Sequence, residues 1–167
     1  MDGAERQDPD ERGGARIQAA VARVVRWAGR GDVRRRLLGP SGRDLSGVDV
    51  DVLRTVVASG PLRVSELADR QGVDKSTMTP QVRKLEERGL LARRPDPHDR
   101  RGVLVSATPR GRRVRSRMDA AGAAVFDEVL RDWPTADRAA LADLLGRLVR
   151  ELDERPLGRP RSDGPAP

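Results

Sequence analysis

Apolar residues recur every three or four positions through most of this chain, which is the period of an amphipathic α-helix. The first such stripe spans residues 14–39 and contains Gly29 and Gly31, which favour a bend. A second stripe begins behind Ser46, a suitable helix N-cap, and stops at Gly60. The N-terminal third is therefore predicted to be helical.

The C-terminal part of the chain shows the same period. Thr108 and Pro109 suit the N-cap and first position of a long helix, because proline there gives up only an N–H that has no helical partner. The apolar stripe of this helix is predicted to continue to Trp133, and Pro134 then starts a last helix. One face of the last helix carries five leucines: Leu141, Leu144, Leu145, Leu148 and Leu152.

Two shorter helices joined by a tight turn are predicted in the middle of the chain. Ser65 is a suitable N-cap for the first, Gly72 closes it, and the second ends before Gly89. The second helix has an apolar face of Met78, Val82 and Leu85, and an opposite face of Ser76, Thr79, Pro80, Arg83 and Lys84. Two helices around a tight turn, the second with a polar outer face, form a helix-turn-helix.

A projecting ribbon is predicted directly after this motif. Residues 90–94 and 103–106 have the composition of short strands, and the segment PDPHDRRG between them is too long and proline-rich for a tight hairpin turn. A helix-turn-helix followed by such a ribbon is a winged helix. The predicted fold class is therefore mostly α, formally α+β, with a winged helix-turn-helix between N- and C-terminal helices.

Positive charge is concentrated around the second helix of the motif and the ribbon. Residues 83–117 hold 12 cations and 4 anions, a balance of +8, whereas the whole chain carries +7. One segment thus carries the whole excess, as a surface that binds a polyanion such as DNA requires. The alternative interpretation is a solvated charged face in an arginine-rich protein.

The remaining composition excludes several function classes. The chain has no Cys and one His, so disulfides, thiol chemistry and thiolate metal sites are excluded and no catalytic constellation is found. We therefore expect neither an enzyme nor a cofactor or metal. The acidic pairs Asp49/Asp51 and Asp127/Glu128 do not share a helical face and are interpreted as solvated surface. The polar N-terminus and the lack of a long uncharged apolar stretch predict a cytoplasmic protein without a membrane partner.

The stretch VSELADRQGVDKSTMTPQVRKLEERGLLARRPDPHDRRGVLVSATPRG, residues 64–111, resembles the MarR family of transcriptional regulators. The most specific part is the wing sequence DPHDRR followed by Ala107, Thr108 and Gly111. With the flanking helices, the resemblance covers about residues 15–153. It implies a homodimer in which the terminal helices of two subunits interlock and hold two winged helices side by side on double-stranded DNA. The alternative for the terminal helices is an intramolecular bundle.

Pattern and resemblance together divide the chain into five segments. The two ends are rich in proline, glycine and charge and are predicted to be disordered. The segments are a tail (1–13), a dimerisation helix (14–39), a winged helix-turn-helix domain (45–107), C-terminal dimerisation helices (108–153) and a second tail (154–167).

The resemblance also implies which side chains reach DNA. In the recognition helix, Arg83 could contact guanine and Gln81 adenine, whereas Lys84, Arg88 and Arg94 suit phosphates. The recognition-helix candidates are Ser76, Thr77, Thr79, Pro80, Gln81, Arg83 and Lys84; the wing candidates are Arg94, His98, Asp99, Arg100 and Arg101. The family pattern places Arg101 in the minor groove, oriented by Asp99, with Arg100 on the backbone. The alternative is that Asp99 and Arg101 form only a surface ion pair.

Two features depart from this picture or extend it. Pro80 stands where the family has a basic or polar residue, so either Thr79 caps a late-starting helix with Pro80 in its first turn, or the helix starts near Ser76 and kinks. The family also binds small, often aromatic anions where the terminal helices join the winged helix. Trp27 and Trp133 are candidates for lining such an effector pocket, although core packing is the alternative.

The function predicted from the sequence is a homodimeric, sequence-specific DNA-binding regulator. We expect it to repress transcription from a pseudo-palindromic operator, to be released by a small effector, and to be nucleoid-associated in a bacterium when bound. The alternative is a winged-helix protein-interaction module without sequence-specific DNA binding, for which Pro80 is the main argument.

Overall fold

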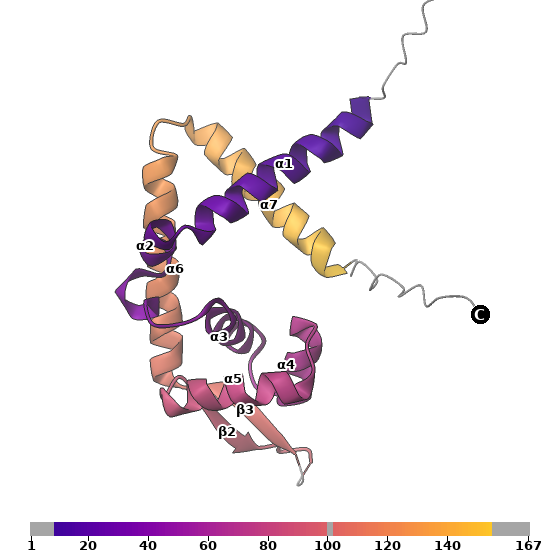
Figure 1. Cartoon of the computed structure of the whole chain (residues 1–167), viewed down its shortest axis with the longest axis vertical. Helices are drawn as coiled ribbons and strands as arrows, with labels where there is room; N and C mark the ends of the chain where they lie inside the picture. Colours follow the sequence, from indigo (N-terminus) through magenta and orange to yellow (C-terminus); the bar gives the residue numbers. More distant parts are fainter. Residues whose placement is uncertain (1–8, 100–101, 155–167) are drawn as a thin grey trace, which may run out of the picture. The chain divides into compact units, whose positions relative to one another are not determined.

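The computed structural model describes residues 9–99 and 102–154 and confirms the mostly helical winged-helix fold (Figure 1). The chain forms two compact units, the first ending at Val125 and the second beginning at Phe126. In chain order the elements are α1 (Pro9–Gly29), α2 (Gly31–Gly42), α3 (Gly47–Ser59), β1 (Leu62–Arg63), α4 (Val64–Gln71), α5 (Lys75–Glu87), β2 (Leu91–Pro95), β3 (Val103–Ala107), α6 (Pro109–Val129) and α7 (Thr135–Glu154).

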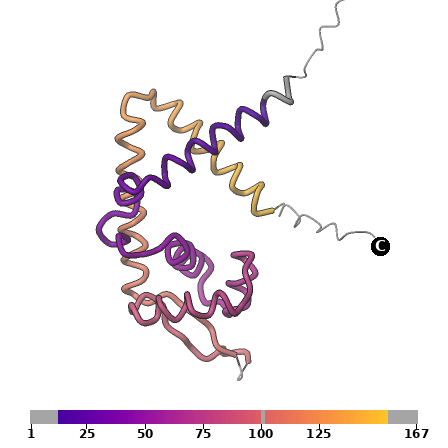
Figure 2. The backbone as a smooth tube through the Cα atoms, viewed as in Figure 1, coloured from indigo at the N-terminus to yellow at the C-terminus, as the bar shows by residue number. Residues whose placement is uncertain are grey.

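The helix-turn-helix consists of α4 and α5, joined by a turn that can be followed in the backbone trace (Figure 2). Gly72 adopts the left-handed conformation at the end of α4, with φ 65°, and its N–H donates to the Ala68 and Asp69 carbonyls. Glycine adopts this conformation without a steric penalty, which is why the helix ends there. The predicted turn is thus confirmed.

The wing is an antiparallel ribbon of β2 and β3, and β1 adds a third strand on the other side of β3. Leu91 pairs with Ala107 and Pro95 with Val103, while Leu62 of β1 pairs with Val105. The sequence pattern did not predict β1, which is only two residues long.

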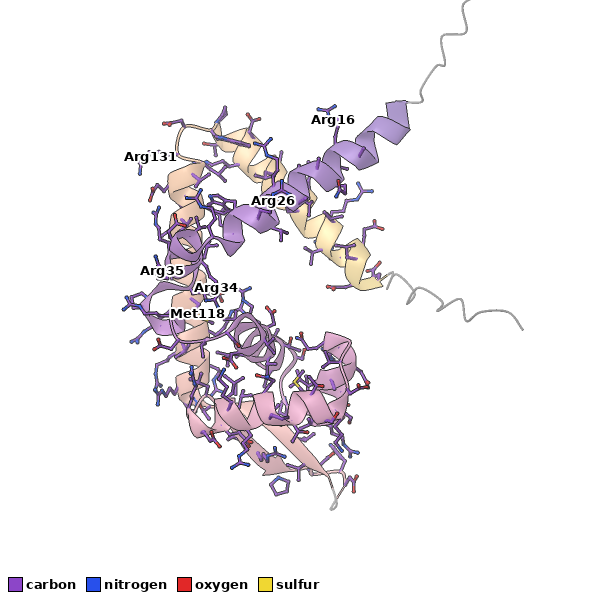
Figure 3. All side chains as sticks on the ribbon, in the orientation of Figure 1. Arg16, Arg26, Arg34, Arg35, Met118 and Arg131 are labelled. Carbon is purple, nitrogen blue, oxygen red and sulfur yellow. The ribbon has the colours of Figure 1, made fainter. Side chains whose placement is uncertain are left out.

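The core of the first unit lies between the helix-turn-helix, α3, the sheet and α6. Its fully buried side chains include Leu53, Leu67, Met78, Leu85 and Met118. Close backbone approach also contributes: a side chain at Gly111 of α6 would collide with the Leu90 carbonyl oxygen. Figure 3 marks Met118, whose sulfur lies against Gly42 at the end of α2 and leaves no room there for a Cβ atom.

Several predicted helix boundaries are corrected at the N-terminus. Residues 9–13, expected to belong to a disordered tail, are part of α1, and Pro9 is compatible with a first helical position. The stripe over residues 14–39 is divided by Arg30, whose extended backbone separates α1 from α2. Helix α4 starts at Val64, so the N-cap residue is Arg63 and not the predicted Ser65, and the Glu66 carboxylate accepts the Arg63 N–H at 2.6 Å.

The C-terminal prediction needs one correction. Helix α6 starts at Pro109 as predicted, and the Thr108 hydroxyl accepts the Gly111 N–H at 3.0 Å. The helix ends at Val129, so Trp133 lies in the following turn, where its N–H donates to the Leu130 carbonyl and its side chain is exposed. The leucine stripe of α7 has no buried member. Residues 1–8 and 155–167 of the predicted tails lie outside the described residues.

Candidate nucleic-acid interface

Helix α5 turns its apolar face into the core and its polar face outward. Met78, Val82 and Leu85 are at most 1% exposed, so their burial fixes the rotation of the helix about its axis. Ser76, Thr77 and Thr79 are exposed on the outer side, and Gln81 is half-buried. The side chain of Arg83 is 77% exposed and pairs through Nε with Glu87 one turn later, at 2.9 Å. A surface pair of this kind contributes only about 0.3–0.5 kcal/mol, so it can be exchanged for a contact to DNA.

Pro80 lies inside α5, which starts at Lys75 behind the N-cap residue Asp74. The interpretation in which Thr79 caps a late-starting helix is therefore wrong, and the early start near Ser76 is correct. Because proline has no N–H, the Ser76 carbonyl lacks its usual helical donor. The Thr79 hydroxyl donates to the Lys75 carbonyl at 2.7 Å. The Pro80 ring is exposed, and the polar side chains near it remain on the outer face of the helix.

Lys84 is partnered within the fold. Its ammonium lies 2.7 Å from Oδ2 of Asp49, a residue with no exposed surface. Asp49 also accepts the Ser46 N–H, and the Ser46 hydroxyl accepts the Asp49 N–H, which forms a capping box at the start of α3. The prediction that Asp49 is solvated surface was wrong. The signal that could have placed it is the Ser-x-x-Asp spacing of a capping box.

The electrostatics of Asp49 follow from these contacts. Burial opposes its ionisation, but the hydrogen bonds from Lys84 and Ser46 outweigh burial and lower the pKa of the carboxyl. Its second oxygen, Oδ1, is buried without a hydrogen-bond partner among the described residues. Lys84 is therefore the cation that balances this carboxylate, and its assignment to a DNA phosphate is weakened.

In the wing, two of the five predicted DNA-contacting residues are described and exposed. Arg94 and His98 are exposed, and the His98 N–H donates to Oδ1 of Asp96 at 2.9 Å. Arg100 and Arg101 lie outside the described residues, so the insertion of Arg101 into a minor groove stays a prediction. Asp99, expected to orient Arg101, accepts a hydrogen bond from Arg63 at 2.9 Å.

Asp96 of the wing and Arg63 of β1 form a contact that the sequence analysis did not predict. Arg63 of β1 donates to Oδ2 of Asp96 from Nη2 at 2.7 Å and from Nε at 3.2 Å. The Asp96 side chain is only 8% exposed. The hydrogen bonds from Arg63, and next the one from the His98 N–H, lower the pKa of Asp96. No local pattern could have indicated a pair so distant in sequence.

Other arginines of the cationic segment are also engaged within the protein. Arg93 donates to the Glu86 carboxylate, and Arg88, a predicted phosphate contact, donates to the Asp44 carbonyl at 2.7 Å. Arg112 donates to the Ala107 carbonyl at 2.6 Å. The charge excess therefore includes cations that stabilise the fold.

A cavity of about 410 Å³ lies between the end of α2, the segment that joins α2 to α3, the end of α5 and the first turns of α6. Its lining combines two arginines and one aspartate with apolar side chains: Ser41, Asp44, Leu45, Arg88, Leu90, Arg110 and Val114. Neither tryptophan is among them. Trp27 is half-buried in α1, and Trp133 lies in a turn of the second unit. Their predicted role in an effector pocket stays untested.

Over residues 9–99 and 102–154, no group of His, Cys, Asp or Glu side chains is arranged to hold a metal ion. No helix within these same ranges is long and apolar enough to span a membrane.

Comparisons with known proteins agree with this architecture. Residues 45–103 match the model of the MarR family. The HTH-type transcriptional regulator YxaD of Bacillus subtilis is 31% identical over 97 residues, which cover 58% of this chain and 68% of that protein. A Thauera aromatica protein, named for regulation of the hcr operon, is 35% identical over 102 residues. That match covers 60% of this chain and 61% of the relative.

Solved structures share the fold. A MarR family protein from Bacillus stearothermophilus aligns with a TM-score of 0.67 and 22% identity, over 83% of this chain and 97% of that chain. A mutant MarR from E. coli complexed with operator DNA aligns with a TM-score of 0.53 and 24% identity, over 77% and 93% of the two chains.

Replacing Asp49 with asparagine is expected to lower the free energy of unfolding by about 1–3 kcal/mol at pH 7, because Lys84 loses its charged acceptor. Since folding lowers the pKa of Asp49, the stabilisation is fully present above its ordinary value of 3.8 and is lost as the pH falls through the folded value. Urea unfolding at neutral and at acid pH should show the difference between wild type and D49N closing below pH 3.8.

Asp51→Asn is the matched control, since Asp51 is exposed on the same helix. It should change the free energy of unfolding by no more than about 0.5 kcal/mol. A D49N protein as stable as wild type at neutral pH would contradict the structural role of the pair.

Proposed function

The chain belongs to the MarR family, and we propose that it is a homodimeric regulator of transcription that binds double-stranded DNA at a pseudo-palindromic operator. The observation that carries the proposal is the outward polar face of α5, held beside the wing by the burial of Met78, Val82 and Leu85. A helix of this kind enters the major groove in helix-turn-helix proteins. The related fold of MarR from E. coli, complexed with operator DNA, supports the same partner.

We assign base reading to α5 and groove or backbone contacts to the wing. Arg83 suits a bidentate contact to guanine and Gln81 one to adenine, while Ser76, Thr77 and Thr79 suit base edges or phosphates. Pro80 offers no donor and suits only apolar contact, as with a thymine methyl group. Arg94, His98, Asp99, Arg100 and Arg101 of the wing keep the roles that the family resemblance implies. We propose that the bound protein represses transcription by blocking polymerase.

The alternative function is a protein-interaction module without sequence-specific DNA binding. Its main argument is Pro80, but α5 accommodates this proline and keeps its polar side chains exposed on both sides of it. These exposed polar side chains favour DNA binding over a role in protein interaction alone. A selection of bound sequences from random DNA separates the two functions, because only a specific binder enriches two half-sites about one helical turn apart.

Arg83→Ala is expected to weaken binding to the selected sequence by about 1–3 kcal/mol and to relax the preference at one base pair of each half-site. Fluorescence anisotropy with selected and scrambled duplexes measures both effects. Arg54→Ala removes an exposed arginine from α3 and serves as the control, with less than a twofold effect. Equal loss on both duplexes would contradict base reading by Arg83.

The homodimer is proposed from the exposed apolar side chains of the terminal helices. On α1, Ile17 and Val25 are 58% and 65% exposed; on α7, Leu144 and Leu145 are 64% and 51% exposed. Burial of each such side chain contributes about 1.5–3 kcal/mol. Covering these stripes with a second copy therefore provides a large driving force for association.

Sedimentation equilibrium is expected to give a dimer for the wild type at micromolar concentration. Leu145→Glu should shift the protein toward monomer, because a charge would be placed in the apolar contact. Arg150→Glu lies on the opposite side of α7 by helical period and should remain dimeric. A monomeric wild type would rule out the dimer.

We also propose that a small anion regulates DNA binding through the cavity of about 410 Å³. Arg88 and Arg110 supply positive charge, and Leu45, Leu90 and Val114 supply an apolar wall, a combination that suits a small aromatic carboxylate. Arg88 lies at the end of α5, so a ligand that draws it from the Asp44 carbonyl would act directly on the recognition helix.

Benzoate is the probe for this cavity. It is expected to bind the wild type in calorimetry and to reduce affinity for the selected duplex, whereas Arg110→Ala should weaken benzoate binding about tenfold by removing a charge-assisted hydrogen bond. Arg113→Ala, an exposed neighbour on α6, is the control. Equal benzoate affinity in R110A and wild type would contradict this site.

A further inference from the structure

One arginine outside both reading elements holds the loop of the wing. Arg63 belongs to β1, directly before α4, yet its guanidinium bonds to both Asp96 and Asp99, near the tip of the ribbon. The distances from Nη2 are 2.7 Å to Asp96 and 2.9 Å to Asp99. A single planar group thus joins two carboxylates of one loop to the start of the helix-turn-helix.

The loop closes around Asp96. Its Oδ1 accepts the His98 N–H, its own N–H donates to the Gly102 carbonyl at 3.0 Å, and the Gly102 N–H donates to the Asp99 carbonyl at 2.8 Å. A Cβ atom at Gly102 would lie 2.9 Å from Cβ of Asp96 and 3.0 Å from Nη2 of Arg63. The loop is therefore packed directly on the arginine.

We propose that Arg63 is a positioning residue for DNA binding, which latches the wing through Asp96 and Asp99 in the orientation that DNA requires. The inference rests on the proposed DNA-binding function. Without Arg63, the nearly buried Asp96 carboxylate would lose the cation that it shares with Asp99, and two carboxylates without a common cation repel each other. The loop would then have to move to hydrate them.

A direct phosphate contact is the competing role for Arg63. Its side chain is 42% exposed and, together with Lys75 and Arg93, lines a cavity of about 330 Å³ between α4, α5 and the wing. The two roles differ in what they predict for Asp96. If Arg63 is a latch, loss of the Asp96 carboxylate weakens DNA binding. If Arg63 contacts a phosphate, loss of the carboxylate frees the guanidinium and strengthens DNA binding.

The test compares R63A, D96N and the double variant in anisotropy titrations with the selected duplex at fixed salt. The latch predicts that R63A and D96N both weaken binding, each about five- to thirtyfold, as for the loss of one positioned contact. The double variant should bind like R63A alone. R63K should rescue only in part, because a single ammonium cannot reproduce the two donors, Nε and Nη2, that the guanidinium directs at Asp96.

Arg70→Ala is the matched control, since Arg70 carries the same charge at the other end of α4 and bonds to Ser59. It should bind within twofold of wild type. If R63A lowers the thermal unfolding midpoint, R63K and D96N carry the comparison.

Opposite effects, with R63A weaker and D96N tighter than wild type, would overturn the latch in favour of a direct phosphate contact. Wild-type affinity in R63A would overturn both roles. A wild type that does not distinguish the selected duplex from a scrambled one would instead refute the proposed function, and the inference with it.

Discussion

Burial of Met78, Val82 and Leu85 against the core sets the direction of every polar side chain on the opposite face of α5. The backbone hydrogen bonds of a helix run along its axis and do not fix its rotation, so this depends on side-chain contacts. With three side chains almost fully removed from water, a rotated helix would expose apolar surface at a cost of several kcal/mol. The outer face is thus as rigidly placed as the core itself.

Two ion pairs extend this constraint to the neighbouring elements. Asp49 and Lys84 connect the start of α3 to α5, and Arg63 and Asp96 connect the start of α4 to the wing. In each pair the carboxylate is buried and the cation is partly exposed. Breaking such a pair from the cation side leaves a charge away from water, which costs more than the loss of a surface pair. The first pair therefore holds α5 against α3, and the second holds the wing against the start of α4.

Local signals were sufficient to predict most of the winged helix. The capping residues Ser46 and Thr108, the left-handed Gly72 and the apolar spacing in α5 each act within a few residues, so the sequence shows them directly. The boundaries of the terminal helices were predicted less accurately. Trp133 continues the apolar spacing of α6 but lies beyond the end of the helix, since spacing alone does not mark where a helix stops.

Only part of the candidate site could be predicted, because some of its contacts are not local in sequence. The polar face of α5 follows from periodicity, whereas the roles of Lys84 and Asp99 depend on which distant groups they meet. The partners Asp49 and Arg63 lie far away in the sequence, and charge alone does not distinguish a cation that faces solvent from one that balances a buried carboxylate. The contacts of Arg100 and Arg101 stay predictions.

The placement of Lys84 on Asp49 has a practical consequence for labelling. Lys75 and Lys84 are the two lysines of the sequence, and both lie in α5. The side-chain amines available to acylating dyes therefore lie in this helix alone, and Lys75 is the more accessible of the two because Lys84 is held by a carboxylate. Since the sequence has no cysteine, a single introduced thiol would accept a second dye independently, and energy transfer between the two dyes would report the movement of α5.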